Sequence, residues 1–90
     1  MYTVYVLYSG EENKFYIGQT EDIDRRFKEH KAGHNHTTLR YKNPTLVYLE
    51  SYINKQDSMR REKYFKTTAG KRTLRLMLKE TLLYNRCPVV

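Results

Sequence analysis

The stretch MYTVYVLYSGEENKFYIGQT, residues 1–20, determines the fold prediction because it contains two strand-like segments and a turn. Valine and tyrosine dominate residues 1–9, and a second β-prone segment covers residues 14–20. The residues GEEN between them favour a turn, whereas β-branched and aromatic residues favour extended backbone. The stretch therefore predicts an antiparallel hairpin.

A short turn in this hairpin would bring Tyr8 opposite Phe15 and Tyr5 opposite Gly18. Because successive side chains of a strand point to opposite faces, Tyr5 and Tyr16 would then share one surface. Glycine weakens a strand interior, and one reason to keep it is the close approach of another group to the tyrosine hydroxyls. Aromatic packing on the sheet is the alternative explanation for these tyrosines.

The central part of the chain predicts one helix and one strand. Thr20 or Asp22 can cap a helix that ends at Gly33, and the polar residues GHNHTTLRYKNP that follow predict a surface loop. The segment TLVYLESYI, residues 45–53, is expected to form the third strand.

The C-terminal part predicts two more helices. One begins at Asn54 or Asp57 and ends near Gly70, and the other follows it directly. The last helix is expected to bury an apolar stripe formed by Leu74, Met77, Leu78 and Leu82. The order of elements predicts one α/β domain of the α+β type over residues 1–83, with a tail at 84–90. Its small three-stranded antiparallel sheet is expected to be flanked by three helices.

The composition favours a polyanionic partner. The chain has 17 Lys and Arg against 10 Asp and Glu, a formal charge of +7, which favours nucleic acid over simple solubility as its explanation. Cys87 is the one cysteine, so neither an intramolecular disulfide nor a cysteine-based zinc site is expected. No segment approaches the roughly 20 apolar residues of a membrane helix. We therefore expect a cytoplasmic protein without a membrane partner, a monomer or a weak homodimer.

Arg26 and His30 occupy unusual positions on the first predicted helix. They share a face with Ile23 and Phe27, since residues three and four apart lie on one side of a helix. Both side chains could point into one cleft. Alternatively, the Arg26 stem packs along the apolar seam while its charged end stays in water.

Glu62 occupies a similarly unusual position on the second predicted helix. It shares a face with two apolar residues, Met59 and Phe65, and with Lys66. A buried carboxylate needs a cation or a metal ion nearby, because desolvation otherwise favours its neutral form. A simple surface pair with Lys66 is the other explanation.

Four motifs together resemble the GIY-YIG endonuclease superfamily. They are TVY at residues 3–5, YIG at 16–18, DIDRRFKEH at 22–30 and MRREKYFK at 59–66. An arginine eight residues after the YIG glycine, a histidine four further on and a later R-R-E helix make this combination specific. The resemblance covers residues 2–66 and is strongest to small bacterial members. These are relatives of the nuclease domain of the excision-repair nuclease and of homing endonucleases.

The resemblance implies a divalent-metal-dependent DNA endonuclease that acts in repair or recombination. Its catalytic residues would be Tyr5, Tyr16, Arg26, His30 and Glu62. Glu62 would bind Mg²⁺ or Mn²⁺, and Arg26 would contact the phosphate. Tyr16 would act as general base, with Tyr5 positioning the water or sharing the proton and His30 orienting a tyrosine or relaying a proton.

Basic side chains along the chain are expected to hold the nucleic-acid backbone. The candidates are Lys14, Arg25, His36, Arg40, Lys42, Lys66, Lys71 and Arg72. Of these, His36 is similar to a loop histidine of homing endonucleases. A catalytically silent nucleic-acid-binding module with the same fold is the alternative to an enzyme. A purely structural role would leave Glu62 and the pair of Arg26 and His30 unexplained.

Overall fold

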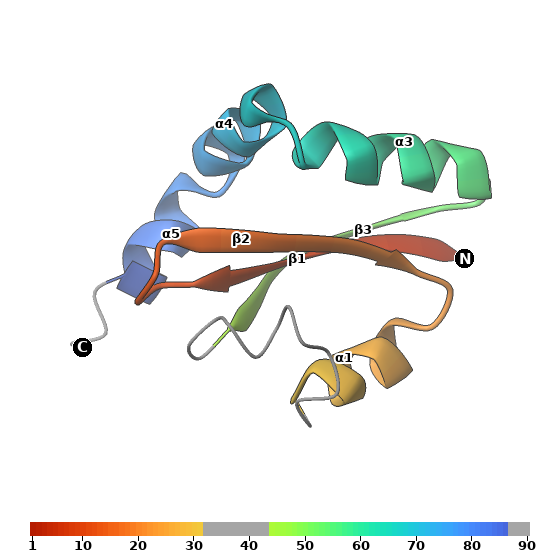
Figure 1. Cartoon of the computed structure of the whole chain (residues 1–90), viewed down its shortest axis with the longest axis horizontal. Coiled ribbons are helices and arrows are strands. Elements are labelled where there is room, and N and C mark those ends of the chain that lie inside the picture. Colours follow the sequence, from red (N-terminus) through yellow and green to blue (C-terminus); the bar gives the residue numbers. More distant parts are fainter. Residues whose placement is uncertain (32–43, 87–90) are drawn as a thin grey trace.

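The computed structural model describes residues 1–31 and 44–86 (Figure 1). Its elements, in chain order, are β1 Tyr2–Ser9, β2 Lys14–Thr20, α1 Ile23–Lys31, β3 Thr45–Tyr52, α3 Lys55–Phe65, α4 Thr68–Met77 and α5 Lys79–Arg86. The predicted α+β class with a three-stranded antiparallel sheet is confirmed. In the described part of the chain, no helix has the length and apolar character needed to cross a membrane.

The sheet has the strand order β2-β1-β3, so that β1 is the central strand. The predicted hairpin register is confirmed, because Tyr8 pairs with Phe15 and Tyr5 pairs with Gly18. On the other side of β1, the register with β3 shifts between Val6 and Leu7. The shift is a local irregularity of the kind that bends a strand and increases its twist.

The hairpin turn is held by hydrogen bonds from two directions. Asn13 adopts a left-handed backbone conformation, with φ 56°, and its amide donates to the Ser9 carbonyl at 2.7 Å. The buried Tyr8 hydroxyl donates to the Asn13 side-chain oxygen. Arg75 of α4 donates to the same oxygen at 3.0 Å. The turn is therefore tied both to the sheet and to α4.

One face of the sheet forms the apolar core. The core combines side chains from β1, β2 and three helices, namely Val4, Val6, Tyr8, Phe15, Ile17, Phe65, Leu74, Leu78 and Leu82. In Figure 1, α3 and α4 lie on one side of the sheet and α1 lies on the other. Tyr5 alternates with the core residues of β1, so its side chain points toward the side of α1.

One helix boundary differs from its prediction. Asn54 caps α3, since its side chain accepts from the Gln56 amide at 2.8 Å, but the helix ends at Phe65 and not near Gly70. Gly70 lies inside α4 instead, where its amide donates at 3.0 Å to Thr67, the N-cap residue. A new cap at Thr67 starts a new helix, and a helix-ending role for Gly70 was wrong.

The predicted third helix is two helices, which brings the described residues to four helices in all. The chain leaves helical geometry at Leu78, with φ −108° and ψ 26°, and α5 continues to Arg86. Leu74, Leu78 and Leu82 are buried as predicted, whereas Met77 is 42% exposed.

Gly70 permits the tight junction between α3 and α4, and a side chain there should destabilise the fold. A Cβ atom at this position would overlap the Tyr64 carbonyl oxygen and lie 2.7 Å from the Phe65 Cα, both backbone atoms. We expect Gly70→Ala to lower the free energy of unfolding by about 2 kcal/mol. Urea denaturation measures this change, with the exposed Thr68→Ala as control at within about 0.5 kcal/mol. Equal stabilities of the two variants would contradict the junction's role.

Candidate active site

Tyr5 is the centre of the candidate site. Its side chain is 2% exposed, and its ring lies over Gly18, the residue opposite it on β2. A Cβ atom at Gly18 would overlap the Tyr5 hydroxyl oxygen and the ring carbon that bears it. The group that closely approaches this glycine is thus the Tyr5 ring itself, whereas the sequence predicted the approach of another group to the tyrosine hydroxyls.

Tyr16 and Arg26 flank the Tyr5 hydroxyl. The rings of Tyr5 and Tyr16 lie with centroids 6.4 Å apart and planes tilted by 36°. Arg26 Nε donates a hydrogen bond to the Tyr5 hydroxyl at 3.2 Å. Asp22 caps the first turn of α1, the helix that carries this arginine, because its side chain accepts from the Arg25 amide at 3.1 Å.

Glu62 of α3 is the acidic residue that acts electrostatically on Tyr5. Its negative charge lies close enough to Tyr5 to raise the pKa of that hydroxyl. The Glu62 side chain is 24% exposed and pairs with Lys66 Nζ at 3.2 Å. The carboxylate is thus partly buried and also paired. Met59 was expected to anchor this face but is exposed, and the buried residues of α3 are Ser58 and Phe65.

Burial raises the pKa of Tyr5 above its ordinary value of 10.0 and outweighs the hydrogen bond from Arg26, which lowers it. The neighbouring Tyr16 and Glu62 raise the pKa further, because a second negative charge disfavours a tyrosinate. Tyr5 therefore keeps its proton at neutral pH. A hydroxyl in this state can donate a hydrogen bond to an anionic oxygen and is unsuited to act as a base.

The donor chemistry of Glu62 fits a hard divalent cation. Mg²⁺ binds to proteins through one or two carboxylates, keeps several waters and completes its coordination with substrate phosphate oxygens. Glu62 supplies one partly exposed carboxylate, whose charge acts on Tyr5. Within residues 1–31 and 44–86, no group of three or more His, Cys, Asp and Glu side chains gathers as a metal site.

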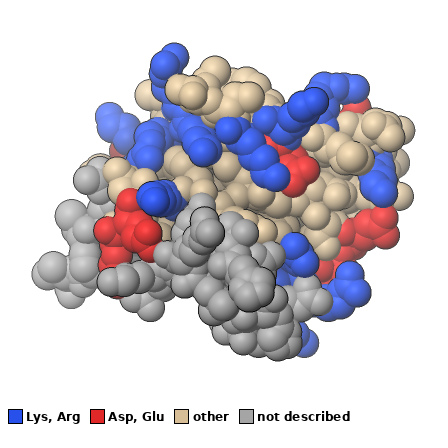
Figure 2. All heavy atoms as spheres, viewed as in Figure 1, with Lys and Arg blue, Asp and Glu red and all other residues tan. Residues whose placement is uncertain are grey.

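The predicted nucleic-acid-binding residues lie partly inside and partly outside the described part of the chain. The described basic candidates are all exposed, namely Lys14, Arg25, Lys66, Lys71 and Arg72. Figure 2 shows Lys and Arg side chains gathered over the region of α3 and α4. His36, Arg40 and Lys42 lie outside the described residues, as does the side chain of His30.

Sequence reasoning missed a second polar cluster, on the core side of β3. Arg61 Nε donates to Glu50 at 2.7 Å, and the Tyr48 hydroxyl donates to the same carboxylate at 2.9 Å. The alternation of Tyr48, Glu50 and Tyr52 places these side chains on one face of the strand. That alternation was the available signal, because a carboxylate between two inward tyrosines needs a cation.

Comparisons with known proteins identify the family of this chain. Residues 1–75 match the family model of the GIY-YIG catalytic domain. A UPF0213 protein of Limosilactobacillus reuteri is 38% identical over 68 residues, 72% of this chain and 70% of that protein. A UPF0213 protein of Natronomonas pharaonis is 35% identical over 79 residues, 87% and 92% of the two chains. The solution NMR structure of the UPF0213 protein BH0048 from Bacillus halodurans has a TM-score of 0.54 and 30% identity, covering 86% of this chain and 85% of that one.

The raised pKa of Tyr5 predicts a loss of stability in alkali. An unfolded tyrosine loses its proton near pH 10, whereas folded Tyr5 holds its proton to higher pH. Stability present below pH 10 is therefore lost as the pH rises from 10 through the folded pKa. Urea denaturation at pH 9 and pH 11 should show a smaller loss for Tyr5→Phe than for the wild type. Burial also raises the pKa values of Tyr48 and Tyr52, so Tyr5→Phe should still lose part of its stability in alkali. Equal losses in the two proteins would show that Tyr5 titrates normally.

Proposed function

Because this chain belongs to the GIY-YIG catalytic domain family, we propose that it is an endonuclease that hydrolyses DNA phosphodiester bonds with a divalent metal ion. One observation carries the proposal. Arg26 donates to the Tyr5 hydroxyl at 3.2 Å, beside Tyr16 and within the electrostatic reach of Glu62. Phosphodiester hydrolysis needs a base for water, cationic donors for the phosphate and a carboxylate for a metal ion. These four residues supply those groups.

The two tyrosines take different roles in this proposal. Tyr16 is the general base that removes the proton from the attacking water. Tyr5, whose pKa is raised, stays protonated and donates a hydrogen bond to the water or to a phosphate oxygen. The other possibility for Tyr5, sharing the proton with Tyr16, is disfavoured because the raised pKa of Tyr5 keeps its own hydroxyl protonated.

The charged residues act on the phosphate. The Arg26 guanidinium presents several planar donors, which suit the nonbridging oxygens of a phosphate under attack. Glu62 would hold Mg²⁺ or Mn²⁺ through its carboxylate. When bound, such an ion neutralises negative charge on the phosphate and stabilises the departing oxygen. His30 keeps the role implied by the family, the orientation of a tyrosine or the relay of a proton.

The exposed basic side chains extend this site into a binding surface. Lys66, Lys71 and Arg72 lie on or near α3 and α4, and Lys14 and Arg25 belong to β2 and α1. Contacts of lysine and arginine with phosphates give affinity without sequence choice and weaken as salt rises. We expect the same of His36, Arg40 and Lys42 in the proposal.

A silent nucleic-acid-binding module is the second candidate, and one observation favours it. Lys66 Nζ lies 3.2 Å from the Glu62 carboxylate, so an ammonium group already neutralises the proposed metal ligand. If a metal ion cannot displace this ammonium, the chain would bind nucleic acid without cutting it. The pair is partly exposed, and exposed ion pairs contribute little stability. Displacement by a divalent ion is therefore the expected outcome.

Cleavage should require Glu62 and Tyr16. We expect wild type to nick supercoiled plasmid and to cut labelled oligonucleotides in Mg²⁺ or Mn²⁺ but not in EDTA. Glu62→Gln and Tyr16→Phe should each lower the rate about 100-fold or more, because each removes a group that acts in the transition state. The matched control Glu80→Gln changes an exposed carboxylate of α5 and should cut at the wild-type rate.

Two results would overturn this assignment. Nicking by both site variants at the wild-type rate would mean that a contaminant cuts. Salt-dependent binding of DNA by wild type with no cleavage in either metal would establish the silent module instead.

Lys66 should compete with the metal ion for Glu62. We expect Lys66→Met to bind Mn²⁺ about two- to fivefold more tightly than wild type, because the mutation removes a neighbouring cation whose pairing is worth that factor. The signal of free Mn²⁺ in electron paramagnetic resonance measures the affinity without any cleavage. In the double variant with Glu62→Gln the gain should vanish. Unchanged affinity in Lys66→Met would place the metal ion elsewhere.

A further inference from the structure

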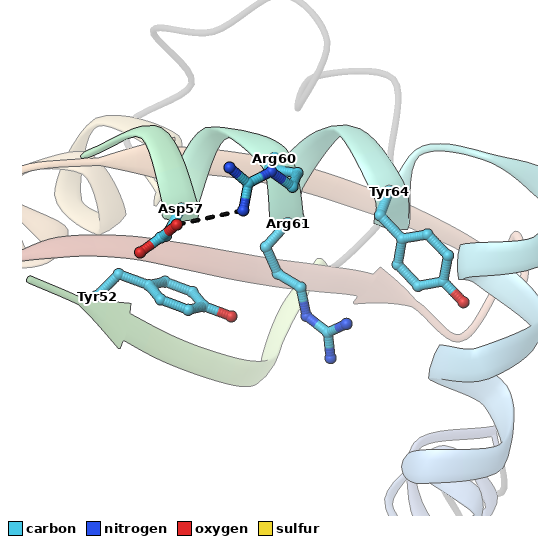
Figure 3. A pocket seen from close by; sticks show the side chains of 5 residues that line it. All are labelled: Tyr52, Asp57, Arg60, Arg61 and Tyr64. Atoms are coloured by element: carbon cyan, nitrogen blue, oxygen red, sulfur yellow. Dashed lines mark hydrogen bonds and ion pairs between the residues drawn. The ribbon is translucent and has the colours of Figure 1, made fainter. Parts of the chain in front are cut away.

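A hollow of about 460 Å³ lies between β3 and α3, outside the candidate active site. Its lining consists of Tyr52 from the end of β3 and of four α3 residues, Asp57, Arg60, Arg61 and Tyr64. Figure 3 shows the Arg61 side chain extending from α3 between the two tyrosine rings. The volume lies within the range of small-molecule sites, roughly 300–1,000 Å³.

The hollow and Glu62 occupy opposite flanks of the same helix. Successive residues of an α-helix are rotated by about 100°, so Tyr64 and Glu62 point about 160° apart. Phe65 lies between these directions and is buried in the core. The helix is only about 10–12 Å across, so a flexible polymer bound at Glu62 can reach the hollow within a few monomer units.

Arg61 is held in place as part of the hollow's wall. Its guanidinium carbon lies 4.3 Å from the Phe65 ring centroid and 5.6 Å from that of Tyr64. Its Nε donates to Glu50, which also accepts from Tyr48. The Arg61 side chain nevertheless remains 33% exposed. A fixed, partly exposed guanidinium loses little conformational entropy when a ligand covers it.

This lining matches the chemistry of a planar aromatic ligand. Unpaired nucleic-acid bases stack on tyrosine rings and on the guanidinium plane of arginine. At the rim, Arg60 donates to Asp57 at 3.2 Å, so a donor and an acceptor lie side by side. Arginine and aspartate side chains both form hydrogen bonds with base edges. The ion pairs of Arg60 and Arg61 balance the local charge, which favours an uncharged ring over a phosphate.

We propose that this hollow binds one unpaired base of a single-stranded segment of nucleic acid. The proposal rests on the proposed function and narrows its substrate, because the strand would pass from the hollow across α3 to the Glu62 flank. Bases inside an intact duplex are paired and stacked, so they cannot enter. The preferred substrate is therefore single-stranded, frayed or branched DNA.

Binding in EDTA tests the proposal without cleavage. Fluorescence anisotropy would compare a labelled single-stranded oligodeoxynucleotide with a blunt duplex of the same sequence. We expect Tyr64→Ala to weaken single-strand binding about tenfold and duplex binding less than twofold, since one base–aromatic stack is lost. Tyr64→Phe keeps the ring but loses the hydroxyl contact with Thr73, 2.8 Å away, and should bind normally. Met59→Ala, an exposed position of α3 outside the hollow, is the matched control.

A second variant and a second signal guard against a folding defect. Arg61→Lys keeps the charge but loses the planar guanidinium, and it should also weaken single-strand binding at an unchanged salt slope. In the wild-type complex, 2-aminopurine placed at successive positions should change fluorescence at one position and lose that change in Tyr64→Ala. Equal weakening of single strand and duplex, or wild-type binding by Tyr64→Ala, would overturn the proposal.

The two proposals fail in different ways. If the wild type stacks a base in the hollow but never cuts, the proposed nuclease activity is wrong and the proposed base site stands. If the protein cuts in a metal-dependent way but the Tyr64 and Arg61 variants bind single strands normally, the nuclease activity stands and the proposed base site is wrong.

Discussion

The missing side chain at Gly18 is the constraint on which the candidate site depends. Tyr5 and Gly18 are paired across the hairpin, and the Tyr5 ring occupies the space that any Cβ atom at Gly18 would need. This close fit fixes a buried hydroxyl where Arg26 reaches it at 3.2 Å. Burial of that hydroxyl is also the main cause of its raised pKa. Glycine lowers the stability of a strand, and the close fit of the Tyr5 ring explains why glycine nevertheless occupies this position.

Helix α3 connects the core to the site. Phe65 is fully buried against the sheet, and it thereby fixes the rotation of the whole helix. With this rotation set, the charge of Glu62 acts on Tyr5, and Arg61, about 100° away around the helix, binds Glu50. Packing of one phenylalanine thus positions a carboxylate and a guanidinium with different roles. Lys66 pairs with this carboxylate at 3.2 Å, and Figure 2 shows Lys and Arg side chains gathered over the region of α3 and α4.

The sequence predicted the sheet and the pairing of Tyr5 with Gly18 because short-range rules govern them. The catalytic residues came from the resemblance of four motifs to a nuclease family, and they stay a prediction. Period-two alternation and a short turn were enough to pair Tyr5 with Gly18, and Asp22 and Asn54 were recognisable caps. The break at Leu78 and the exposure of Met59 and Met77 were not predictable in this way. They depend on how the helices meet the sheet in three dimensions, which helical periodicity alone does not specify.

The most direct test of the proposed site is to locate the metal ion and a bound phosphate by NMR. Mn²⁺ would be added to the ¹⁵N-labelled protein with a single-stranded oligonucleotide made uncleavable by phosphorothioate linkages. We predict that paramagnetic broadening is strongest at the amides of Gly18, Arg26 and Glu62 and weakest at α5, which lies at the other end of the sheet (Figure 1). Strongest broadening at α5, or at positions remote from Gly18 and Glu62, would contradict the proposed site.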